Sequence, residues 1–71
     1  MSSTFIETEA GRLQNLYLLQ DVRVMESAVN KDKYTIGWVQ MNGQIIQEGD
    51  FDTYEAADSK RTEIVNRLIS Q

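Results

Sequence analysis

In the C-terminal half of the chain, two runs of mixed apolar and polar residues lie on either side of a short turn sequence. Two runs rich in β-branched and aromatic residues occupy positions 33–41 and 44–51, and Asn42-Gly43 separates them. A two-residue type I′ turn needs positive φ at both central positions, which Asn tolerates and Gly adopts without steric cost. The pattern therefore predicts a β-hairpin with Asn42-Gly43 as its loop.

A two-residue loop determines which side chains share a face of the predicted hairpin. It places Val39 opposite Ile46, and at the far end of the hairpin it places Tyr34 opposite Phe51. One face then carries Tyr34, Ile36, Trp38, Ile45 and Phe51, and the other carries Val39, Met41 and Ile46. We expect the first group to form the core. Gly37, on the second face, indicates a bulge, a bend or a close approach by another element.

The N-terminal half of the chain predicts three further strands. They cover residues 4–8, 12–16 and 22–29, and Gly11 favours a tight loop between the first two. The segment 17–21 suits a buried helical turn as well as a continued strand, and we favour a short turn.

A helix over residues 53–69 is predicted by apolar residues that recur at helical spacing. Asp52 or Thr53 can cap its N-terminus, and with Asp52 as the cap Glu55 completes a capping box. The predicted fold class is α+β: residues 1–71 form a single domain with a twisted antiparallel β-meander of four to five strands. One C-terminal helix packs on one face of the sheet.

The residue inventory argues against catalysis and metal binding. The 71 residues include no Cys and no His, so thiol, imidazole and Ser-His chemistry and the usual zinc ligands are missing. A calcium loop beginning at Asp50 would need Gly at its sixth position and Glu at its twelfth, where Glu55 and Arg61 stand. We expect no enzyme activity, no metal and no cofactor.

The length and the net charge of the chain indicate which kinds of partner it can bind. So small a domain commonly needs self-association when it lacks disulfides and metals. The net charge of −4 argues against nucleic-acid binding, and the absence of a leader or of a long apolar run predicts a cytoplasmic protein that does not enter a membrane. Nucleic-acid targeting is the alternative function, either by base stacking on Tyr34 and Trp38 or by the acidic stretch 48–58 acting as a phosphate mimic.

Two features point to assembly. Arg61 interrupts the apolar stripe of the predicted helix, where it either extends its methylenes over apolar surface or pairs with an acid of a second subunit. Val39, Met41 and Ile46 form an apolar group that the single helix, placed on the other face, cannot cover. We therefore expect a non-enzymatic interaction or assembly module that binds a second copy or another protein, with a homodimer favoured. The interface residues are Val39, Met41, Ile46 and Arg61.

Overall fold

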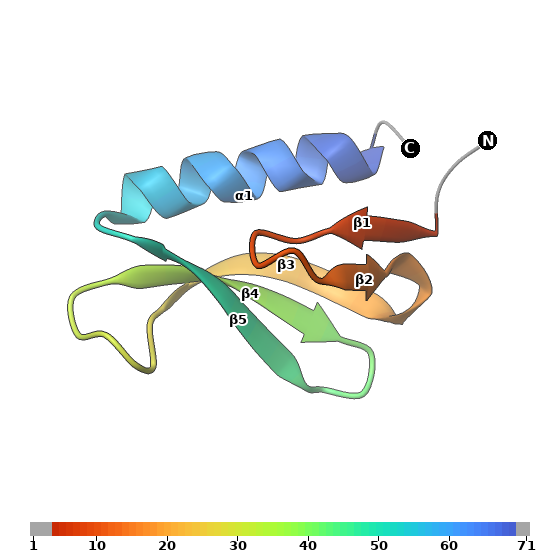
Figure 1. The fold of residues 1–71 in the computed structure, drawn as a ribbon, viewed down its shortest axis with the longest axis horizontal. Helices are drawn as coiled ribbons and strands as arrows, with labels where there is room; N and C mark the ends of the chain where they lie inside the picture. Colours follow the sequence, from red (N-terminus) through yellow and green to blue (C-terminus); the bar gives the residue numbers. More distant parts are fainter. Residues whose placement is uncertain (1–3, 70–71) are drawn as a thin grey trace.

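The computed structural model describes residues 4–69, which form an α+β fold with five strands and one α-helix. The elements are β1 (Phe5–Glu7), β2 (Leu13–Asn15), the 3₁₀ helix η1 (Leu16–Leu18), β3 (Leu19–Glu26), β4 (Tyr34–Gln40), β5 (Ile45–Phe51) and α1 (Tyr54–Ile69). β1 and β2 form a two-stranded antiparallel sheet, and β3-β4-β5 form a three-stranded meander (Figure 1). The predicted fold class is confirmed, with the strands divided between two sheets.

The helix and the β1–β2 hairpin lie on the same side of the three-stranded sheet (Figure 1). The core between these layers draws residues from both: Ile6, Val22, Ile36, Trp38, Ala57 and Ile64 are buried together. We call the sheet face that carries α1 and the hairpin the inner face, and the opposite one the outer face. Burial of this apolar cluster is the main force that holds the layers together.

The β4–β5 loop differs from the predicted two-residue turn. The Gln40 N–H donates to the Gln44 carbonyl at 2.7 Å and the Gly43 N–H donates to the Gln40 carbonyl at 3.0 Å, so residues 41–43 form a three-residue loop. Gly43 has a φ of 89°, and Asn42 does not adopt positive φ. The Asn42 side chain instead accepts the Gln44 N–H at 2.9 Å, an Asx turn that favours this loop over the predicted type I′ turn.

The longer loop shifts the register of β4 and β5 by one residue. Val39 pairs with Ile45, and Trp38 pairs with Ile46. Since side chains alternate along a strand, a one-residue shift moves each β5 side chain next to the loop to the other face. Ile46 therefore packs against the core on the inner face, and the prediction that placed it on the outer face with Val39 was wrong.

A bulge further along β5 restores the predicted pairing at the far end of the hairpin. The register changes between the Tyr34 and Ile36 pairs, next to Gly49, which has a φ of 87°. Tyr34 pairs with Phe51, as the sequence indicated. Both aromatic side chains pack against the core.

The outer face of the central strand is covered by its own neighbours. Thr35 and Val39 are only 3% and 8% exposed. A Cβ atom added to Gly37 would lie 2.3 Å from Met25 Sδ, so Gly37 marks the close approach that was one of three predicted possibilities. Gln47 Nε2 also lies 3.9 Å from the Met25 sulfur. Side chains of β3 and β5 thus supply much of the cover that the sequence left unassigned.

β3 begins and ends earlier than the predicted strand 22–29. The turn predicted over residues 17–21 is present only in part: residues 17 and 18 belong to η1, and the strand already starts at Leu19. At the other end, Ser27 Oγ accepts the N–H groups of Val29 and Asn30 at 3.2 and 3.0 Å, which turns the chain out of the sheet.

Thr53 caps the helix. Its Oγ1 accepts the Ala56 N–H at 3.1 Å, whereas Asp52, the alternative cap, forms an ion pair with Lys33. No helix within residues 4–69 combines the length and the apolar character needed to cross a lipid bilayer.

Candidate functional site

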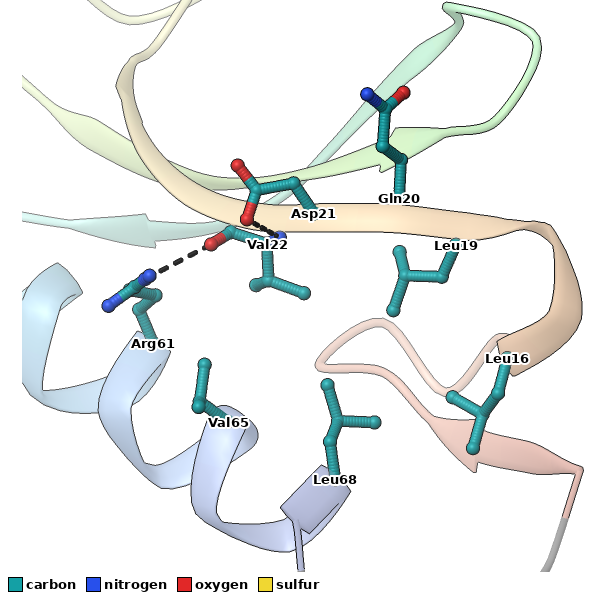
Figure 2. A pocket seen from close by; sticks show the side chains of 8 residues that line it. All are labelled: Leu16, Leu19, Gln20, Asp21, Val22, Arg61, Val65 and Leu68. Atoms are coloured by element: carbon teal, nitrogen blue, oxygen red, sulfur yellow. Dashed lines mark hydrogen bonds between the residues drawn. The ribbon is translucent and has the colours of Figure 1, made fainter.

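An open apolar groove lies between the edge strand β3 and helix α1. Its volume is about 440 Å³, and we call it the β3–α1 groove (Figure 2). Five aliphatic side chains and three polar residues line it: Leu16, Leu19, Val22, Val65 and Leu68, with Gln20, Asp21 and Arg61. Of the aliphatic residues only Val22 is fully buried, so the groove presents apolar surface to solvent.

The groove follows from an irregularity in β3 and from the spacing of the helix. The register shifts between Leu19 and Asp21, and Figure 2 shows Gln20 pointing away from the helix while Leu19 and Val22 point toward it. On α1, Arg61, Val65 and Leu68 follow at intervals of four and three residues, which places them on one side of the helix. Strand and helix therefore face each other with aliphatic side chains.

Arg61 lies at one end of the groove and contacts the backbone of the edge strand. Its Nε donates to the Val22 carbonyl at 3.0 Å, and the Val22 N–H donates to Asp21 Oδ1 at 2.8 Å (Figure 2). Two side chains thus satisfy both backbone groups of Val22. Within residues 4–69 no carboxylate lies at ion-pair distance from Arg61, whose positive charge contacts a neutral carbonyl.

The other prominent polar cluster holds the N-terminal hairpin on the sheet. Glu48 accepts from Arg12 Nε at 2.7 Å and from the Ala10 N–H at 3.3 Å. Burial raises the pKa of the Glu48 carboxyl, but hydrogen bonds from Thr8, Arg12 and Ala10 outweigh it and hold the pKa below its ordinary value. The partners of the Glu48 carboxylate all belong to the β1–β2 hairpin, so this cluster attaches the hairpin to β5.

A reciprocal amide pair adds to this attachment. Gln14 Nε2 donates to Gln40 Oε1 at 2.9 Å, and Gln40 Nε2 donates to Gln14 Oε1 at 3.1 Å. Lys60 on the helix contacts Glu9 of the hairpin at 3.0 Å, and this contact raises the pKa of the Lys60 amine. Each bond joins two elements of the fold, so we assign these residues a structural role.

The structure separates the four interface residues predicted from the sequence. Met41 and Ile46 line a smaller cavity of about 250 Å³ at the β4–β5 loop, together with Leu18. Met41 is 63% exposed, whereas Val39 is buried on the outer face. Arg61 lies at the β3–α1 groove. The predicted patch is thus divided between three places.

None of the five aliphatic groove residues was predicted as an interface residue. Val65 and Leu68 belong to the apolar stripe that also contains Arg61, and this stripe was their signal in the sequence. Leu16 and Leu19 fall in or beside the segment whose structure the sequence left ambiguous. Their position in the groove depends on β3 starting at Leu19 and forming an edge of the sheet, and the sequence shows neither.

The residues proposed for base stacking are occupied within the fold. Trp38 is fully buried, so no base can stack on its ring. Tyr34 packs edge-to-face on Tyr54 with ring centroids 5.9 Å apart. Glu48, at the start of the acidic stretch, is buried against Arg12 and is not part of an exposed acidic surface.

Residues 4–69 hold no group of three or more Asp or Glu residues arranged to bind a metal ion. Comparisons of the chain with protein-family models, curated proteins and solved structures find no match.

Proposed function

We propose that this domain is a non-enzymatic protein-interaction module and that the β3–α1 groove is its binding surface. One observation carries the proposal: an open aliphatic groove runs beside the backbone of an edge strand and ends at Arg61, an arginine that no described carboxylate pairs with. The lack of Cys and His in the chain supports the non-enzymatic part of the proposal.

Two kinds of contact would act together in this surface. A partner segment in extended conformation adds a strand at the open side of β3, which gives backbone hydrogen bonds. Alternate side chains of that segment enter the groove and cover Leu19, Val65 and Leu68. Each 100 Å² of apolar surface removed from water contributes about 2.5 kcal/mol, before the cost of ordering both partners.

A charge placed in the groove tests the proposal. Val65→Glu puts a carboxylate among the aliphatic side chains, and Thr62→Glu puts the same charge on an exposed position of the same helix. Binding is measured in two ways with each protein: by selection of linear peptides from a random display library, and by sedimentation over a concentration series. Circular dichroism verifies that both variants are folded.

We expect the wild type to bind selected peptides or to self-associate. We expect Val65→Glu to lose this binding by at least about tenfold and Thr62→Glu to keep it. A wild-type protein that selects no peptide and remains monomeric at millimolar concentration would show that the proposal is wrong. So would binding that the folded Val65→Glu variant retains in full.

A further inference from the structure

We propose that the partner segment at this surface is β3 of a second copy, paired antiparallel about a two-fold axis between the two Val24 residues. In this arrangement Arg61 of each copy meets Glu26 of the other. The inference rests on the proposed function and specifies the partner for the same surface.

The backbone of β3 offers hydrogen-bonding groups at the required positions. Along an antiparallel strand, alternate residues direct both their N–H and C=O groups away from the neighbouring strand. Val22 is one of these, because both of its groups bond to side chains rather than to β4. Val24 and Glu26 therefore also point outward, and no described residue bonds to those groups of Val24. A pairing of Val24 with Val24 of the second copy uses them directly.

Charge selects this register over its neighbours. An axis at Val22 would bring two Arg61 side chains together, and an axis at Arg23 would place that arginine opposite its own copy. The axis at Val24 pairs Val22 with Glu26 of the second copy, and residues opposed in this way lie about 5 Å apart at their Cβ atoms. Residues 22, 24 and 26 share the inner face, on which Arg61 lies.

Both charged groups are available for this contact. Glu26 is exposed and Arg61 is half-buried, and within residues 4–69 neither has an ion-pair partner. On pairing, the backbone of Glu26 replaces the Asp21 and Arg61 side chains on Val22. The released guanidinium then binds the Glu26 carboxylate of the second copy. Because the dimer is two-fold symmetric, it contains two of these Arg61–Glu26 ion pairs.

The α1 helices of the two copies do not block the two-fold axis at Val24. The loop after β3 of the second copy also reaches the β3–α1 groove. Arg61 contacts β3, but at the N-terminal end of α1 Tyr54 packs on Tyr34 of β4, so the helix crosses away from the sheet edge. The same register brings the loop after β3 of the second copy to the mouth of the groove near Leu19. That loop carries Val29, which is 88% exposed and becomes covered there.

Charge reversal tests the arrangement. Arg61→Glu and Glu26→Arg each place like charges at both contacts, so we expect each variant alone to dimerise at least about tenfold more weakly than the wild type. A 1:1 mixture of the two variants forms one native and one reversed ion pair. We expect heterodimers at concentrations where each variant is monomeric, and weaker association at high salt. Sedimentation equilibrium measures all of these. If a variant dimerised weakly only because it was unfolded, mixing it with the other variant would not restore dimerisation.

Three results would overturn the inference: a wild type that remains monomeric, a dimer that both single variants retain, or a mixture that shows no recovery. Val29→Ser adds a charge-neutral test, and unchanged dimerisation would contradict the predicted cover at the groove. A monomer that still selects peptides through Val65 would refute the second copy while leaving the proposed function intact.

Discussion

At the scale of single residues, two glycines on the same hairpin have positive φ for different reasons. Gly43 lies in the loop with open space around the position of a Cβ atom, whereas a Cβ on Gly49 would lie 2.7 Å from Cε2 of Phe51. Backbone conformation is the only obstacle to a side chain at Gly43. At Gly49 a clash with the Phe51 ring is added, so a larger residue there also requires that ring to move.

Replacing each glycine by alanine separates these two costs. We expect Gly43→Ala to lower the free energy of unfolding by about 1 kcal/mol, since it forces a left-handed conformation only. Gly49→Ala should lower it by about 2–4 kcal/mol, because Phe51 must also move. Urea unfolding followed by Trp38 fluorescence measures both. Equal losses would contradict a tightly packed bulge at Gly49.

At the scale of elements, the sequence predicted the kind of structure better than its register. The type and order of the strands and the helix followed from alternation and helical spacing, as in the segment 33–51. The choice between a two-residue and a three-residue loop depends on a side-chain bond from Asn42, which alternation does not report. The three-residue loop places Ile46 against the core and removes it from the predicted outer patch.

The start of the helix gives a second case, in which two caps were possible and one is used. Thr53→Ala removes the hydrogen bond to the Ala56 N–H, and we expect it to lower the free energy of unfolding by about 1 kcal/mol. Asp52→Ala removes only an exposed ion pair with Lys33 and should change stability little. Thermal unfolding of both variants measures the difference. A larger loss with Asp52→Ala would show that Asp52 is the cap in solution.

At the scale of the whole molecule, the candidate site arises from the relation between layers. Arg61 could be singled out from the sequence because it interrupts an apolar stripe. The rest of the β3–α1 groove could not, since it depends on β3 being an edge strand and on the helix crossing it. The groove therefore forms only because the edge strand of the sheet lies beside the helix. The spacing of residues within one element does not show which elements lie side by side.

The attachment of the N-terminal hairpin to the sheet should make stability depend on pH through Glu48. The pKa of Glu48 in the folded protein lies below its ordinary value, so its stabilising contribution is present above the unfolded pKa of about 4.3. It is lost as pH falls through the lower folded pKa. Because Arg12 is 34% exposed, solvent screens part of the attraction, and we expect a contribution of about 1–2 kcal/mol at neutral pH.

The comparison of wild type with Glu48→Gln isolates this contribution. The wild type should be more stable at pH 7, and the difference in the free energy of unfolding should shrink as the pH falls below about 4. Glu7→Gln, on the exposed side of β1, is the matched control, and its difference from wild type should stay nearly constant. Urea unfolding at a series of pH values from about 2.5 to about 7 measures the free energy of unfolding of the wild type and of both variants. A Glu48→Gln difference that did not change with pH would mean that ionisation of Glu48 does not stabilise the fold, since protonating the wild-type carboxyl would then cost no stability.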